Sequence, residues 1–255
     1  MPHDWFSKLT GFREESYQLT RSQLDIEGDE LVSTVNGKRY GAGSLSLPTL
    51  AELRNRVDVP RDKRSTVRGV TGDARAMHAD AELEGALFQV ASQFNLLEMA
   101  GPSVSPEDGV TRYSGDHTQG PACAIAAGGR TAPRCRGHRC ARRRTTPRLA
   151  GVLFALPVAY GSGRQSAWEP FARLVLEATY EATLSAAVEQ SLAGRSNTVL
   201  LTRVGGGVFG NADAWIDDAI VRAPTLVEHA GLDIQLVSYG QVHQLFRAIT
   251  ERFGG

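Results

Sequence analysis

The spacing of apolar positions changes along the second half of the chain, and the changes predict alternating helices and strands. Residues 171–193 repeat apolar side chains every three to four positions, which is typical of an amphipathic helix of about six turns. The leucine-rich and β-branched run over residues 197–204 predicts a buried strand. A helix over 212–223, a strand over 232–238 and a last helix over 241–253 complete the pattern.

This strand–helix–strand–helix ending predicts parallel strands joined by right-handed crossovers. Two strands are expected earlier, over residues 66–73 and 86–94, with an alanine-rich helical segment between them that extends to about Leu83. A helix is the alternative for residues 86–91. The predicted fold class is therefore α/β, a three-layer α/β/α domain with a mixed, largely parallel sheet. We assign residues 61–255 to this domain.

Residues 1–60 are polar and mixed, and they are predicted to form an N-terminal extension or small lobe. A helix is expected over 12–19, and a pair of strands is expected on either side of the Asn36-Gly37 turn signal. Residues 48–54 have a proline near the start and predict a short helix.

Two segments in the middle of the chain lack this periodicity. Residues 100–128 are rich in glycine, proline and polar side chains, and a loop of that length is usually functional or disordered. Residues 129–150 are predicted to be irregular, because positions 129–148 contain eight arginines and no acid. The arginines are one candidate for binding the phosphates of nucleic acid, although no aromatic side chain is interleaved for stacking. A shifted reading frame or internal deletion is another explanation for this composition.

The length, charge and hydropathy of the chain exclude some classes of protein. A chain of 255 residues has room for one substantial core, alone or with a small appendage. Its 28 basic and 28 acidic residues balance, so no global charge directs it to nucleic acid or to a membrane. It has no apolar run long enough to span a membrane, and its first residues do not resemble a signal peptide, so a cytoplasmic location is expected.

The three cysteines do not suggest a disulfide framework, because their number is odd and no secretion signal is recognised. Cys135, His138 and Cys140 have a spacing that superficially suggests zinc, but a fourth ligand is missing. No metal and no cofactor is predicted.

The sharpest chemical signal is a glycine-rich loop, residues 205–211, between a predicted strand and a predicted helix (hereafter the glycine loop). Its four glycines, Gly205, Gly206, Gly207 and Gly210, allow positive φ angles and a close approach of the backbone to a ligand. Asn211 is the expected cap of the following helix. Free amides in such a loop hold phosphates, each with about 1.5–3 kcal/mol. The alternative is a tight turn without a ligand.

The glycine loop resembles a known family. The residues Gly206, Gly207, Val208, Phe209 and Gly210 are similar to the second phosphate-binding loop of macrodomains, which are ADP-ribose-binding α/β/α modules. The resemblance implies that the loop holds the diphosphate of ADP-ribose and that Phe209 packs on a ribose.

Two further positions resemble macrodomain motifs. Asp73 ends a predicted strand, as does the aspartate that accepts from the adenine amino group in that family. Asn95 follows the next predicted strand and resembles the asparagine that meets the distal ribose.

The family's first glycine-rich loop is not visible, and an acidic and polar stretch takes its place. If the chain is a hydrolase, Glu107, Asp108 and Asp116 are the candidates to activate a water, and Gln119 is the candidate to orient the ribose. The alternative for each is a solvated loop residue.

The resemblance implies binding of ADP-ribose or an ADP-ribosylated macromolecule, with cleavage of ADP-ribosyl linkages as the enzymatic hypothesis. A non-catalytic ADP-ribose reader is the first alternative. Nucleic-acid binding through residues 130–148 is the less favoured one.

Overall fold

The computed structural model describes residues 11–13, 15, 17–27, 30–41, 48–72, 77, 80–91, 148–152, 158–160 and 163–253. The chain divides into two compact units. The smaller comprises Met1–Ser46 and Asn95–Thr146, and the larger comprises Leu47–Phe94 and Pro147–Gly255. The candidate acidic residues Glu107, Asp108 and Asp116 lie outside the described residues, as do Asp73, Asn95 and Gln119.

The described part of the smaller unit is a helix followed by a three-stranded antiparallel sheet. Its elements are α2 (Tyr17–Ser22), β1 (Leu24–Glu27), β2 (Glu30–Ser33) and β3 (Arg39–Gly41). The predicted strand pair around Asn36 is therefore confirmed as β2 and β3. Gly37 turns the chain with a φ of +68°, and the N–H of Ser33 donates to the Lys38 carbonyl over 2.8 Å.

Two features of this unit differ from the prediction. Phe12 is not helical, and the helix begins at Tyr17 instead. The N–H of Glu15 donates to Thr20 Oγ1 over 3.1 Å, so a side chain engages the backbone just before the helix. The sequence pattern also missed β1, whose partner in the sheet is β2.

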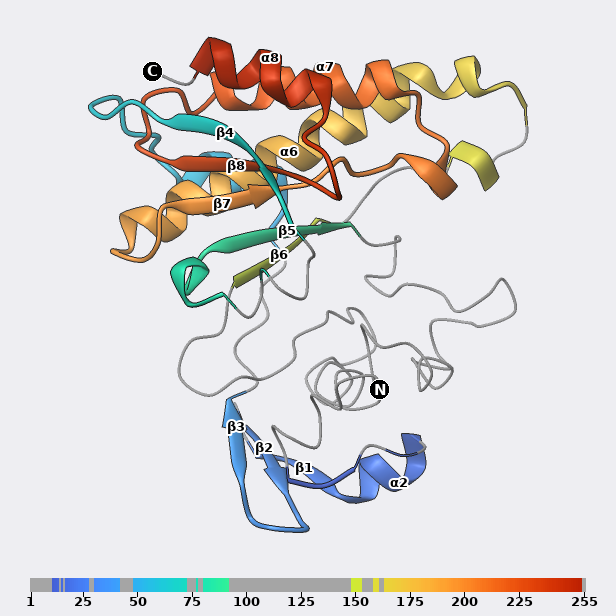
Figure 1. The fold of residues 1–255 in the computed structure, drawn as a ribbon, viewed down its shortest axis with the longest axis vertical. Helices are drawn as coiled ribbons and strands as arrows, with labels where there is room; N and C mark the ends of the chain where they lie inside the picture. Colours follow the sequence, from blue (N-terminus) through green and yellow to red (C-terminus); the bar gives the residue numbers. More distant parts are fainter. Residues whose placement is uncertain are drawn as a thin grey trace. The chain divides into compact units, whose positions relative to one another are not determined.

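The larger unit is built on a five-stranded sheet with the order β4-β8-β7-β5-β6 (Figure 1). The strands are β4 (Thr66–Thr71), β5 (Leu87–Ala91), β6 (Arg148–Val152), β7 (Thr198–Leu201) and β8 (Asp233–Ser238). Every pairing between them is parallel. The predicted strands, the parallel arrangement and the α/β class are thus confirmed, and no antiparallel strand belongs to this sheet in the described residues.

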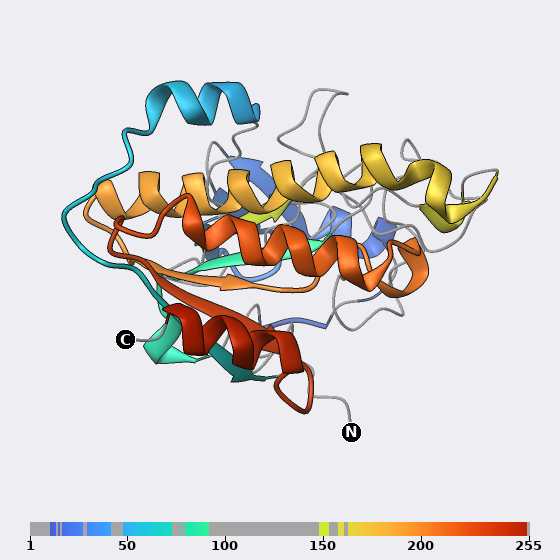
Figure 2. The same ribbon diagram turned by 90° about the horizontal axis from the view of Figure 1, so that it is seen from above.

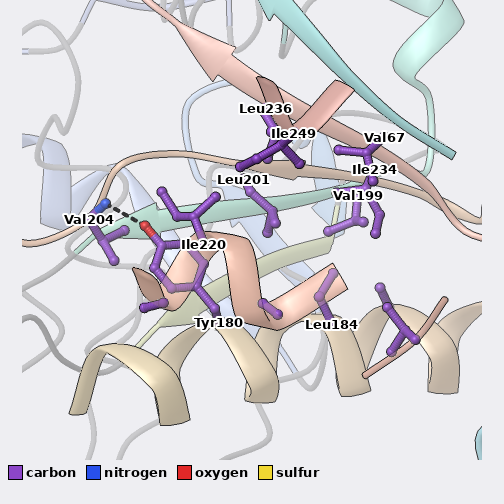
Figure 3. Close-up of a cluster of buried hydrophobic side chains, with 14 of the residues drawn as sticks. Val67, Tyr180, Leu184, Val199, Leu201, Val204, Ile220, Ile234, Leu236 and Ile249 are labelled. Carbon is purple, nitrogen blue, oxygen red and sulfur yellow. Dashed lines mark hydrogen bonds between the residues drawn. The ribbon is translucent and has the colours of Figure 1, made fainter. Parts of the chain in front are cut away.

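One large hydrophobic cluster joins the sheet to its helices. The cluster contains side chains of α6 (Glu169–Leu192), α7 (Asp213–Thr225) and α8 (Gln244–Phe253), with Val199, Leu201, Ile234 and Leu236 of the strands (Figure 3). Strand side chains alternate between faces, so Phe88 and Leu200 point to the opposite face. There they pack with Met77 and Leu83 from the connection between β4 and β5. The sheet therefore lies between two layers, as the predicted three-layer fold requires.

Helices α6 and α7 run side by side, and α3 (Leu50–Arg56) lies along α6 (Figure 2). The prediction of a helix over 48–54 is confirmed, and Thr49 and Glu52 form a capping box at its start. Arg54 forms an ion pair of 2.5 Å with Glu181 of α6. The predicted boundary near residue 60 falls after α3, whereas α3 packs within the larger unit.

The connection between β4 and β5 contains a short 3₁₀ turn, η1 (Ala81–Leu83). Met77 is also helical in the structure, and the other residues of the predicted alanine-rich segment before it lie outside the described set. Strand β6 begins at Arg148, so the last three residues of the segment expected to be irregular belong to the sheet.

Leu184 and Leu174 of α6 test this packing as a matched pair. Leu184 is fully buried in the large cluster, whereas Leu174 is 62% exposed. Leu184→Ala is expected to lower the free energy of unfolding by about 2–5 kcal/mol, because it removes apolar contacts and leaves a cavity. Leu174→Ala is expected to change it by no more than about 0.5 kcal/mol. Urea denaturation followed by circular dichroism measures both, and equal losses would contradict the described core.

Candidate functional site

Strands β5 and β7 part at the carboxyl edge of the sheet, where the glycine loop begins. Their ladder has only two residue pairs, Leu87 with Val199 and Phe88 with Leu200. From β7 the chain continues through α7 to β8 on one side, whereas β6 lies on the other side of β5. Strand order therefore reverses between these two strands. In open α/β sheets, ligands bind at the carboxyl ends of strands at such a reversal.

A buried polar network holds the end of β7 in place. The hydroxyl of Tyr180 donates to the Thr202 carbonyl over 2.7 Å and accepts from the N–H of Val204 over 3.0 Å (Figure 3). Burial raises the pKa of this hydroxyl above its ordinary value, so it stays protonated at neutral pH and remains a donor. Tyr180 thereby fixes both sides of the turn that leads into the glycine loop.

Gln89 of β5 extends the network beyond the point where the ladder ends. Its side-chain oxygen Oε1 accepts a hydrogen bond from the N–H of Thr202 over 3.0 Å. Its Nε2 donates over 3.2 Å to the hydroxyl of Thr183, which in turn donates to the Thr179 carbonyl. Gln89 and Thr183 are both buried, and hydrogen bonding offsets the cost of that burial.

The first residues of the glycine loop alternate in the sign of φ. Gly205 has a φ of +87°, Gly206 a φ of −75° and Gly207 a φ of +56°. Successive N–H groups in an αR–αL or turn conformation form concave backbone sites that bind anions. Gly206, with a ψ of −172°, is extended and not αR. The N–H groups of residues 205–208 donate no hydrogen bond to any other described residue. Of these residues, Gly205 is buried, Gly206 is partly buried and Gly207 is exposed.

The second half of the loop is closed on itself. The N–H groups of Phe209, Gly210 and Asn211 donate to the carbonyls of Gly206, Gly207 and Gly205, through the 3₁₀ turn η6 (Gly207–Phe209). These three amides are therefore committed within the loop. The free amides expected from the sequence are therefore not those of residues 209–211.

Asn211 does not cap α7, which corrects the prediction. The residue at the cap position is Ala212, in an extended conformation and without a side-chain hydrogen bond to the helix. The Nδ2 group of Asn211 instead donates over 2.7 Å to the carbonyl of Gly205, and Asn211 is buried. The backbone N–H and the side-chain Nδ2 of Asn211 both donate to the carbonyl of Gly205, and together they hold the loop closed.

Residues 158–160 and 165–168 lie at the far end of the loop. They form η4 (Val158–Tyr160) and η5 (Gln165–Trp168). Gln165 Nε2 donates over 2.6 Å to the Gly210 carbonyl. A Cβ atom at Gly210 would lie 2.8 Å from the Cβ of Ala159, and Gly210 has a φ of +70°. Only glycine fits this position without a shift of η4.

Sequence reasoning located the glycine loop but missed the residues that hold it. Tyr180 was expected only as part of a helix, and Gln89 only as part of a strand. A polar Gln89 within an apolar run was the available signal. Tyr239 was also missed: it follows β8, the neighbour of β7, and is 88% exposed at the same carboxyl edge.

Comparison with known proteins gives limited information. No family model matches the chain, and no curated protein matches it. Among solved structures, a poly(ADP-ribose) glycohydrolase from Thermomonospora curvata matches with a TM-score of 0.44 and 14% identity, covering 88% of this chain and 93% of that one. A poly(ADP-ribose) glycohydrolase from Deinococcus radiodurans in complex with ADP-ribose matches with a TM-score of 0.39 and 15% identity, covering 82% and 97%. We therefore rest the function on the glycine loop.

None of the described helices combines the length and the apolar character that a membrane-spanning helix needs.

Tyr180→Phe tests the polar network with the loss of one oxygen atom. The variant leaves the Thr202 carbonyl and the Val204 N–H without their buried partner, so the free energy of unfolding should fall by about 1–3 kcal/mol. Tyr239→Phe is the matched control, because the same atom is lost from an 88% exposed side chain and no more than about 0.5 kcal/mol should change. Urea denaturation of both variants makes the comparison. A Tyr180→Phe protein as stable as the control would refute the network's role.

Proposed function

We propose that the glycine loop binds the diphosphate of ADP-ribose or a related nucleotide diphosphate. The observation that carries the proposal is the set of four N–H groups at residues 205–208, which have no partner among the described residues in a backbone of alternating φ sign. Hydrogen bonds from such amides to a charged acceptor contribute about 1.5–3 kcal/mol each. Two or three of them provide enough affinity for a diphosphate group.

Helix α7 adds to the attraction, because its N-terminus follows the loop directly. The positive end of a helix dipole favours an anion by about 0.3–1 kcal/mol. The helix begins at Asp213, three residues after Gly210, and extends for 13 residues. The loop and the helix thus act on the same negative charge.

Two features support a nucleotide rather than a bare diphosphate. The first is the resemblance of residues 206–210 to the diphosphate loop of macrodomains, which includes the aromatic Phe209. The second is the exposed ring of Tyr239 at the same edge of the sheet, because aromatic side chains stack on nucleic-acid bases.

Binding at this loop is a step that a hydrolase and a non-catalytic reader share. Cleavage of an ADP-ribosyl linkage by Glu107, Asp108 or Asp116 remains a prediction, as do ligand contacts from Asp73, Asn95 and Gln119. Nucleic-acid binding through residues 130–148 is a separate prediction that the loop does not require.

Gly207→Glu is the variant that tests the proposed site. Gly207 has a φ of +56° and open space where a Cβ would be, so the glutamate places bulk and negative charge beside the donors. Calorimetric titration with ADP-ribose should show binding by the parent chain and a loss of at least about tenfold in affinity for the variant, through the lost hydrogen bonds and the added repulsion.

Gly194→Glu is its matched control. Gly194 also has a positive φ, +71°, and open space around a Cβ, but it follows the C-terminal end of α6, away from the loop in the sequence. Both variants have a similar backbone strain, so the control should keep the parent's affinity. Equal binding by Gly207→Glu and the parent would contradict the site, and a folded parent that binds no ADP-ribose would contradict the proposed ligand.

A further inference from the structure

Arg203 lies between the end of β7 and the glycine loop, and its guanidinium group is held by two carboxylates of α7. Nη2 lies 2.7 Å from Oδ1 of Asp213, and Nη1 is paired with Oδ1 of Asp217. The Arg203 side chain is only 18% exposed, whereas that of Asp213 is 87% exposed. The arginine therefore joins the strand before the loop to the helix after it.

A carboxylate near the N-terminus of α7 stabilises the helix but weakens the binding of an anionic ligand. An acid in the first turn of a helix stabilises the helix dipole. The same negative charge repels an anion bound beside the N-terminus, with an energy that falls with distance and with solvent screening. A third carboxylate, Asp218, also lies near this end of α7, and its partner is Arg173 at 2.6 Å. Each acid near the N-terminus of α7 is thus paired with an arginine.

We infer that Arg203 sets the affinity of the glycine loop for anionic ligands by offsetting part of the negative charge of Asp213 and Asp217, without contacting the ligand. This inference rests on the proposed function of the loop. Two of the guanidinium donors are already used by carboxylates, and the side chain is mostly covered. Arg203 is therefore a positioning residue that tunes the electrostatic field at the loop.

The affinity of the loop for diphosphate should fall as the negative charge around Arg203 rises. With Arg203 the three side chains have one positive and two negative charges, and Arg203→Met leaves two uncompensated carboxylates. The dissociation constant for inorganic diphosphate should then rise about fivefold. Arg203→Lys keeps the charge and should stay within about twofold of the parent. Asp213→Asn alters an exposed side chain and should lower the dissociation constant about threefold.

The deciding variant combines Arg203→Met with Asp213→Asn and Asp217→Asn. Charge compensation predicts that this triple variant binds at least as tightly as the parent, because the net charge of the three side chains is then zero, compared with −1 in the parent. Direct contact between Arg203 and the ligand predicts that the triple variant stays as weak as Arg203→Met. A purely structural role of the ion pairs also predicts no rescue, because the triple variant still lacks both pairs.

The experiment is calorimetric titration of these variants with inorganic diphosphate and with ADP-ribose, at low and at high salt. Rescue by the triple variant, tighter binding by Asp213→Asn and smaller differences at high salt are the expected results. Binding by the parent that Arg203→Met leaves unchanged, or that the triple variant does not restore, would overturn this inference alone. A parent that binds neither probe would overturn the proposed function and this role of Arg203 with it.

Discussion

The hydroxyl of Tyr180 joins the last residues before the glycine loop into one fixed turn, and the candidate site depends on that turn. Tyr180 accepts from the N–H of Val204 and donates to the carbonyl of Thr202, while Gln89 accepts from the N–H of Thr202. All three bonds lie just beyond the last residue pair of the β5–β7 ladder. A buried polar network is stable only if its groups are satisfied, which makes the start of the loop a defined geometry rather than a flexible connection.

From this fixed start the loop separates its amides into two groups. Those of residues 209–211 close the loop on the carbonyls of residues 205–207, and those of residues 205–208 have no acceptor among the described residues. Asn211 and Gln165 hold the closed half, so that a ligand need not order the backbone when it binds. Arg203 contributes to the charge balance near the loop, because it forms ion pairs with Asp213 and Asp217 at the beginning of α7. Geometry and charge at this edge are thus set by side chains of β5, η5, α6 and α7 and of the segment between β7 and α7.

The elements with a clear period were predictable from sequence, and the contacts between distant elements were not. The repeat of apolar residues from Phe171 onward predicted α6, and the β-branched run before Gly205 predicted β7. Gln89 accepts from the N–H of Thr202, which is 113 residues away, and the sequence around Gln89 does not predict this contact. Asparagine is a common helix-capping residue, but the side chain of Asn211 donates to the Gly205 carbonyl within the loop instead. Only the contact of Gln89 is long-range, whereas that of Asn211 lies within its own loop.

The central claim is that four consecutive amides of the glycine loop donate to an anionic ligand, and amide NMR spectroscopy tests it most directly. In a titration of the ¹⁵N-labelled chain with ADP-ribose, the account predicts downfield shifts of the amide protons of residues 205–208, because these groups gain hydrogen bonds to a charged acceptor. The amides of Phe209, Gly210 and Asn211 should shift less, because they already donate within the loop. Saturable shifts confined to other parts of the chain, with residues 205–208 unchanged, would contradict the account.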